Sequence, residues 1–311
     1  MHGRSKGLAG VSVASIIWGS TALFARWSGA EPLVVVFWRV AIASVALLAY
    51  VFVRGEHKVL PRLGKRALLG LVVLGLLLAI GWGALFTAYT RTSVATAVLL
   101  NYVGPVLVAA LTPMVTHVPS DRRIALPLTL ALMGTAVIVG PQALDATGTQ
   151  NLLGMLLAIV SALTYAASVL ITKRLLVGVS PGIVALAQQA VAAVVLLPAA
   201  LRLPAPVGVP GWGSLVILGV VHSGAAWLLF YTGLRMVRAD QVAVLTYIEP
   251  VAAVIFAALL LAEPLRWYTV VGGAAVVMGG VLVARLGVPP GSEERVPAAV
   301  TSHVPRSGRD L

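Results

Sequence analysis

The chain has 311 residues, of which 59% are hydrophobic and only 10% are charged. This composition excludes a soluble globular domain, because such a domain needs roughly 25% charged residues to cover its surface. The formal net charge of +12 would suggest nucleic-acid binding in a soluble protein, whereas in a membrane protein basic residues gather in the cytoplasmic loops. The absence of cysteine excludes disulfides, thiolate catalysis and cysteine-based metal sites.

Ten apolar runs are long enough to form membrane helices, since a bilayer core about 30 Å thick takes about 20 helical residues. In chain order they cover residues 8–27, 32–53, 67–88, 94–115, 124–140, 152–172, 182–201, 213–234, 241–261 and 268–285. Helices are required because lipid offers backbone polar groups no hydrogen-bonding partner. The sequence therefore predicts an all-α membrane protein with ten transmembrane helices.

Basic residues are distributed unevenly between the two sets of loops. With the N-terminus inside, 17 of the 22 lysines and arginines fall in inside loops and three in outside loops, while Arg26 and Arg39 remain in or near helices. This bias places both termini in the cytoplasm and explains the net charge without nucleic acid. The first run follows basic residues as in a signal peptide, but we expect an uncleaved helix because many spans follow it. Residues 288–311 are rich in proline, serine and charge, which predicts a disordered cytoplasmic tail.

Four matches in the same order along the chain predict an internal repeat. They are NYVGPVLVAAL from 101 with TYIEPVAAVIF from 246, MGTAVIV from 133 with MGGVLVA from 278, WGSTALFAR from 18 with YAASVLITK from 165, and WRVAIASVALL from 38 with QQAVAAVVLLP from 188. The repeats predict two five-helix units, residues 1–145 and 146–287. An odd number of helices inverts the second unit, which is typical of secondary transporters with a substrate site near the midplane.

Three motifs in these runs resemble the EamA branch of the drug/metabolite transporter superfamily. They are IIWGS in the first run, FWR in the second and TYIEPVAAVIFAALLLAEPL in the ninth. The resemblance covers about residues 8–285, and the EP and AEP pair around Glu249 and Glu263 is its most specific part. It implies transport of small metabolites, often outward, without naming the cargo. The first half has Gly104 where the second has Glu249, and no sequence like AEPL follows its fourth run. These departures argue against a mechanism in which both halves bind substrate alike.

Two prolines occupy equivalent places in the repeat. Because proline lacks an N–H, Pro105 and Pro250 free the carbonyls four residues back, those of Asn101 and Thr246. Interrupted spans in corresponding positions indicate a transporter binding site, although membrane helices also tolerate proline as a kink that only shapes packing. The polar residues beside the prolines, and thus the candidates for a cavity, are Asn101, Tyr102, Thr246 and Tyr247.

Glu249 and Arg39 are charges inside apolar runs, where each costs about 2.5–3.5 kcal/mol near the bilayer midplane. They therefore face a cavity or a partner. One interpretation is a structural ion pair that clamps the halves together. The other is that Arg39 holds a substrate carboxylate while Glu249 holds an ammonium group or a coupling proton. Glu263, at the membrane edge, is interpreted as a solvated helix end.

Further candidates have both a packing and a functional interpretation. His222 could relay protons or form a hydrogen-bonded packing contact. Gln188 and Gln189, opposite Trp38 and Arg39 in the repeat, could bind substrate or neighbouring helices. The aromatic residues that could line an amphipathic cavity are Trp18, Trp82, Tyr89, Trp227, Tyr231 and Tyr247. Those interpreted as interfacial anchors are Trp212, Trp267 and Tyr268. The small residues predicted to pack the tenth run closely on a neighbour are Gly272, Gly273, Ala275, Gly279 and Gly280.

The sequence has no HExxH, P-loop or GxGxxG motif, so we expect neither an enzyme nor a cofactor or metal site. The expected function is a secondary transporter that exports small polar or amphipathic metabolites, such as amino acids, by alternating access, with proton coupling through Glu249. The alternatives are a lipophilic-cation or drug exporter and a membrane receptor or scaffold.

Expected partners are a small molecule, the lipid bilayer and a second copy in a homodimer. Arginine outnumbers lysine 18 to 4, which hints at a GC-rich bacterial genome and a bacterial cytoplasmic membrane.

Overall fold

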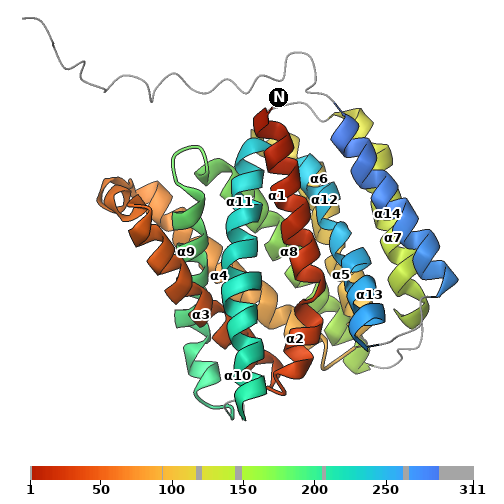
Figure 1. Cartoon of the computed structure of the whole chain (residues 1–311), viewed down its shortest axis with the longest axis horizontal. Helices are drawn as coiled ribbons and strands as arrows, with labels where there is room; N and C mark the ends of the chain where they lie inside the picture. Colours follow the sequence, from red (N-terminus) through yellow and green to blue (C-terminus); the bar gives the residue numbers. More distant parts are fainter. Residues whose placement is uncertain are drawn as a thin grey trace, which may run out of the picture.

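The computed structural model describes residues 2–92, 94–116, 121–143, 149–204, 208–261 and 266–286, and every regular element within these ranges is helical. Figure 1 shows the arrangement. The elements are α1 (His2–Gly19), α2 (Thr21–Trp27), α3 (Pro32–Val53), η1 (Glu56–Arg62), α4 (Lys65–Ala88), α5 (Val94–Asn101), α6 (Val103–Thr116), η2 (Arg122–Ile124), α7 (Ala125–Ala143), α8 (Thr149–Leu175), α9 (Pro181–Ala200), α10 (Gly208–Ile217), η3 (Leu218–Ala225), α11 (Ala226–Met236), α12 (Ala239–Thr246), α13 (Ile248–Leu261) and α14 (Trp267–Arg285).

Nine helical stretches within the described ranges are long and apolar enough to cross a membrane. They correspond to nine of the ten predicted runs, so the prediction of an all-helical, multi-pass membrane protein is confirmed. The fifth run forms α7, which is a helix but does not belong to these nine. Ten spans are therefore not confirmed. The predicted tail and Glu263 lie outside the described residues.

The ends of α3 and α9 follow local sequence signals. Helix α3 starts with a proline in its first turn, where the missing N–H costs nothing, and ends shortly before Gly55, whose φ of 70° suits a left-handed residue after a helix. In α9, the Ser180 side chain accepts a hydrogen bond from the backbone N–H of Ile183, which caps the first turn. Such signals explain why these predicted bounds agree with the structure to within two residues.

Three of the described spans are interrupted by a single non-helical residue. The first is interrupted at Ser20, between α1 and α2, the fourth at Tyr102, between α5 and α6, and the ninth at Tyr247, between α12 and α13. A fourth irregularity is η3, a π-helical segment that joins α10 to α11 within the span Gly208–Met236. These irregularities are the parts of the fold that bear on the site.

Glycines let α7 and α14 approach each other closely. A Cβ added at Gly134 of α7 would lie 2.5 Å from the carbonyl oxygen of Gly272 in α14, and one added at Gly272 would meet the carbonyl oxygen of Gly134 at the same distance. Gly279 of α14 also faces α7, since its added Cβ would lie 2.7 Å from the carbonyl oxygen of Pro127. Of the five small residues predicted to pack the tenth run, Gly272, Ala275 and Gly279 thus face α7, whereas Gly273 lies nearest Val251 of α13 and Gly280 nearest Leu245 of α12. Figure 1 shows α7 and α14 side by side at one edge.

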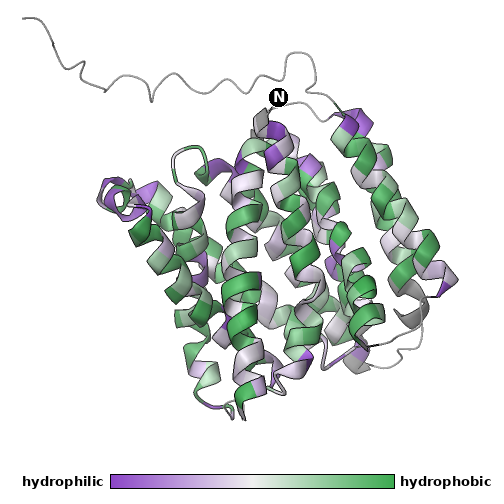
Figure 2. Ribbon diagram, viewed as in Figure 1, coloured by the Kyte–Doolittle hydropathy of each residue, from purple (hydrophilic) through white to green (hydrophobic). Residues whose placement is uncertain are grey.

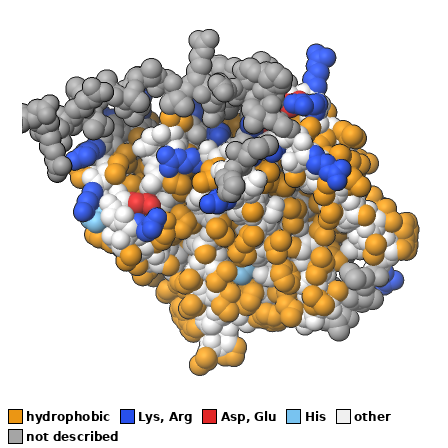
Figure 3. Space-filling model, turned by 45° about the horizontal axis from the view of Figure 1, so that its top comes forward, with side chains coloured by type: hydrophobic (Ala, Val, Ile, Leu, Met, Phe, Trp, Pro, Cys, Tyr) orange, Lys and Arg blue, Asp and Glu red, His pale blue; other side chains and the backbone are white. Residues whose placement is uncertain are grey.

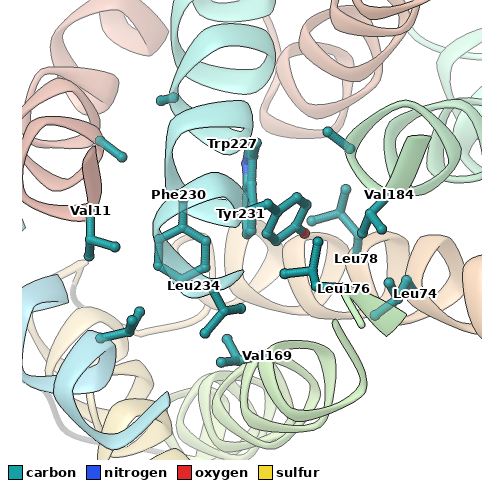
Figure 4. Close-up of a cluster of buried hydrophobic side chains, with 14 of the residues drawn as sticks. Val11, Leu74, Leu78, Val169, Leu176, Val184, Trp227, Phe230, Tyr231 and Leu234 are labelled. Carbon is teal, nitrogen blue, oxygen red and sulfur yellow. The ribbon is translucent and has the colours of Figure 1, made fainter. Parts of the chain in front are cut away.

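The largest core cluster surrounds α11, as Figure 4 shows. Aromatic side chains from this helix project toward aliphatic side chains of α1, α4, α8 and α9. The labelled members are Val11, Leu74, Leu78, Val169, Leu176, Val184, Trp227, Phe230, Tyr231 and Leu234. Burying large apolar and aromatic side chains here fixes α11 and therefore the η3 segment that precedes it.

Hydrophobic and hydrophilic residues occupy different parts of the helices along their length. Hydrophobic residues dominate the middle of the helices in Figure 2, and most hydrophilic ones lie at the ends. Figure 3 shows most of the visible lysine and arginine side chains near the end that carries the N-terminus. The two ends of the described chain meet there, since the Arg4 guanidinium donates to the carbonyl oxygens of Val283 and Leu286. We refer to this as the N-terminal end.

Candidate functional site

A cavity of about 790 Å³ lies between the helices. Its walls come from both halves of the chain, and its lining extends to Ala30, Pro32 and Arg266, which lie at helix ends remote from the N-terminal end and mark what we call the mouth. The cavity therefore opens toward the end of the bundle opposite the N-terminal end. Its volume is within the range of about 300–1,000 Å³ that is usual for small-molecule sites.

Arg39 on α3 is the buried cation of this cavity. Its side chain is only 3% exposed, Nε donates a 2.8 Å hydrogen bond to Oγ of Ser223, and the guanidinium carbon lies 4.0 Å from the centroid of the Trp82 ring. Within the described part of the chain, the two terminal guanidinium nitrogens make no hydrogen bond. The guanidinium is thus fixed at one edge and one face, while its fork is left for a ligand.

Glu249 is the anion of the same cavity. It lies in the first turn of α13, directly after the interruption at Tyr247, where the helix dipole favours negative charge. Within the described residues, the ion pairs are Arg123 with Asp121 and Arg238 with Asp240, and no Arg39–Glu249 contact reaches the 4.0 Å limit of an ion pair. Both charges line the cavity without neutralising each other by direct contact.

The two interrupted spans meet beside these charges. The rings of Tyr102 and Tyr247 stack with centroids 5.5 Å apart and planes 29° apart, and the Tyr247 hydroxyl donates a 2.6 Å hydrogen bond to the Tyr102 carbonyl oxygen. Pro105 and Pro250 follow three residues after the interruptions. The members of this region that line the cavity are Asn101, Tyr102, Pro105, Thr246 and Pro250. Tyr247 is fully buried behind them.

Aromatic side chains form much of the remaining wall. Of the six aromatics proposed from the sequence, Trp18, Trp82, Tyr89 and Trp227 line the cavity, whereas Tyr231 and Tyr247 belong to the core. Sequence reasoning did not single out Tyr165 and Phe86 as site residues, although both line the cavity. The internal repeat was the available signal for Tyr165, because it matches Trp18 in the first half. Tyr268, proposed as an interfacial anchor, lies at the mouth.

His222 and Gln189 lie outside the cavity lining. Nε2 of His222 is 2.8 Å from Oγ of Ser20, and its Nδ1 is 3.3 Å from the Ile217 carbonyl oxygen, so both ring nitrogens contact protein. Gln189 is fully buried on α9, and its neighbour Gln188 accepts a hydrogen bond from the Tyr231 hydroxyl. The structure therefore brings together six of the nine proposed binding or coupling residues: Glu249, Arg39, Asn101, Tyr102, Thr246 and Trp18.

These features define a class, a multi-pass helical membrane protein with a charged and aromatic cavity open at one end. Residues 5–140 and 152–285 both match the sequence model of the EamA-like transporter family. The chain belongs to this family.

Several relatives are similar over most of their length. An uncharacterized transporter of Archaeoglobus fulgidus is 29% identical over 281 residues, covering 89% of this chain and 96% of the relative. The uncharacterized transporter YxxF of Bacillus subtilis (strain 168) is 24% identical, covering 81% of each chain. A biotin transporter of Escherichia coli (strain K12) is 27% identical, covering 82% of this chain and 84% of the relative. A protein known by its crystal structure shares the fold, with a TM-score of 0.78 and 22% identity over 91% of this chain and all of its own.

Proposed function

We propose that this protein is a secondary transporter that exports small polar or amphipathic metabolites, amino acids and related compounds among them, by alternating access. The observation that carries the proposal is the pair of charges, Arg39 and Glu249, which line one cavity without a direct ion pair. An arginine fork suits a carboxylate, and a carboxylate suits an ammonium group. The aromatic wall adds apolar contact for the rest of the molecule.

The interpretation as two inverted units, residues 1–145 and 146–287, is supported by how the helices pair. The family model matches two consecutive stretches, one in each proposed unit. Helices at equivalent places contact each other, α3 with α9 and α7 with α14, and α4 packs on α8 as α11 packs on α1. In this proposal α7, the fifth predicted run, also crosses the membrane, which brings the number of spans to ten. Rocking of one unit against the other would close the present mouth and open the N-terminal end.

The basic residues at the N-terminal end support a cytoplasmic location for both termini, because positively charged loops stay inside. The cavity then opens away from the cytoplasm, as expected for the outward-open state in which an exporter releases its substrate. Proton coupling through Glu249 is part of this proposal. A flux that ignores an imposed pH gradient would remove the coupling from the proposal and leave transport in place.

Tracer flux with the purified protein in liposomes tests the proposal. The panel holds amino acids, biotin, nucleosides, sugars and organic cations; biotin is included because one relative bears the name of its transporter and because it carries a carboxylate. Flux of carboxylate-bearing compounds above that of protein-free liposomes is the expected result. Flux of organic cations alone would replace the proposal with a cation exporter, and no flux of any compound would favour a receptor or scaffold.

A further inference from the structure

The η3 segment is the least regular part of the span that carries it. It is π-helical over Leu218–Ala225, between α10 and α11. Such segments are rare, are stabilised only by their surroundings, and occur frequently at functional sites. Gly219 marks the closest contact, because a Cβ added there would lie 2.6 Å from Cβ of Ile42 on α3. The segment is therefore pressed against the helix that carries Arg39.

Two consecutive residues of η3 reach two different helices. Oγ of Ser223 accepts the 2.8 Å hydrogen bond from Nε of Arg39 on α3. His222 contacts Ser20 through its ring, and its carbonyl oxygen accepts a 2.9 Å hydrogen bond from Nε1 of Trp18 on α1. Ser223 is fully buried and His222 is 1% exposed. The π-helical turn thus forms hydrogen bonds with two cavity residues, Arg39 and Trp18, without itself lining the cavity.

The hydrogen bond from Nε determines which part of the guanidinium is offered to the cavity. Arginine has five N–H donors in a planar fork, and one of them is used by Ser223. The ring of Trp82 covers one face of the plane, with the guanidinium carbon 4.0 Å from the ring centroid. With one edge and one face fixed, the remaining edge carries both terminal nitrogens, the geometry that binds a carboxylate through two parallel hydrogen bonds.

We propose that Ser223, presented by the π-helical turn, is a positioning residue that orients Arg39 for a planar oxyanion. The inference rests on the proposed function, since it concerns the substrate preference of the same cavity. A loosely held guanidinium attracts an anion by charge alone. An oriented one adds two parallel hydrogen bonds to the two oxygens of a carboxylate, which the carboxamide analogue, with a single acceptor oxygen, cannot complete. Ser223 thereby sets specificity without touching the substrate.

The test compares flux of a transported carboxylate and of its carboxamide in Ser223→Ala, Ser223→Thr and a matched control, Ser15→Ala. Ser15 is also a fully buried serine, but its hydroxyl bonds the Val11 carbonyl in its own helix. Loss of a hydrogen bond to a charged group predicts a KM for the carboxylate raised about tenfold in Ser223→Ala, with Vmax retained. The preference for carboxylate over carboxamide should fall by a similar factor. Ser223→Thr should restore both values, and Ser15→Ala should leave them unchanged.

Equal loss for the two analogues, or an unchanged KM, would overturn the inference while leaving transport intact. If Ser223→Ala does not fold, Ser223→Cys replaces it, because a thiol of similar size is a weak acceptor.

A second readout does not need transport. In protein labelled with 15N-arginine, the Nε signal that disappears in Arg39→Lys should shift in Ser223→Ala and stay in place in Ser15→Ala. An unshifted signal would overturn the inference even if the wild type moved no compound in the panel.

Discussion

The hydroxyl of Tyr247 donates a 2.6 Å hydrogen bond to the carbonyl oxygen of Tyr102, and the two rings stack on each other. Each tyrosine is the residue at which its membrane span is interrupted, and the two are 145 positions apart in the chain. The two interruptions therefore form one joint. A motion that moves α12 away from α6 must either break this hydrogen bond or leave Tyr102 and Tyr247 in contact while the helices beside them move.

Removing the Tyr247 hydroxyl should weaken the contact between the two interruptions without leaving a cavity. We expect Tyr247→Phe to lower the free energy of unfolding by about 1–2 kcal/mol, because the Tyr102 carbonyl loses its buried donor while the ring stack remains. Thermal unfolding of the detergent-solubilised protein measures this. Tyr50→Phe, at the far end of α3, is the control. Equal stability of Tyr247→Phe and wild type would show that the hydrogen bond contributes nothing.

Glu249→Gln should abolish or strongly reduce flux while the protein stays folded. The amide keeps the shape of the side chain but carries no negative charge to hold an ammonium group or a proton. Glu31→Gln is the matched control, because Glu31 is an exposed glutamate just before α3. Tracer flux at equal reconstitution decides the matter, and flux in Glu249→Gln equal to that of wild type would make the carboxylate structural.

Trp82→Leu should weaken binding of anionic substrates. The ring lies under the Arg39 guanidinium, and a cation–π contact of this kind contributes about 1 kcal/mol, so KM should rise roughly fivefold. Trp212→Leu is the control, since Trp212 packs edge-on against Trp38 and does not line the cavity. A comparable rise in both variants would point to general loss of packing and not to the cation–π contact.

A chain without cysteine allows the orientation to be tested with single cysteines. In intact cells, Ala30→Cys at the cavity mouth should react with a membrane-impermeant maleimide. Ser5→Cys, exposed at the N-terminal end, should react only after the membrane is permeabilised. The reverse pattern would place the N-terminal end outside and invert the proposed direction of access.

A pH effect is expected outside the spans, at Asp121. Hydrogen bonds from Arg123 hold the pKa of this carboxyl below its usual range in the folded protein. A lowered folded-state pKa stabilises the fold fully above the unfolded pKa, near pH 4, and the contribution is lost as pH falls through the folded pKa. Unfolding measured from pH 7 to pH 3 should therefore show a slightly smaller loss in Asp121→Asn than in wild type. The effect is small, because solvent screens surface pairs.

The sequence predicted the helices well where local signals mark their ends. Residues 32–53 were expected as a span and α3 covers Pro32–Val53, with proline at one end and a glycine after the other. The interruptions were attributed to Pro105 and Pro250, and the structure places them at Tyr102 and Tyr247. The offset has a physical reason, since a proline disturbs the turn that precedes it.

The site was predictable only in part. Arg39 and Glu249 stand out because a charge in an apolar run must face a cavity or a partner. His222 and Gln189 carry a similar signal, yet their side chains lie behind the wall. Helices that are apolar on all sides do not reveal in sequence which face meets a cavity. The role of Ser223 depends on contacts from α3 and on the π-helical turn, and neither has a local sequence signature.

The glycine contact between α7 and α14 also has a consequence for biosynthesis. Gly134 emerges from the ribosome more than a hundred residues before Gly272, the residue whose backbone covers it. At about 5–20 residues per second, the delay is on the order of ten seconds. Until α14 is synthesised, the glycine backbone of α7 lacks the neighbour that covers it in the folded protein, so another molecule must cover it in the meantime.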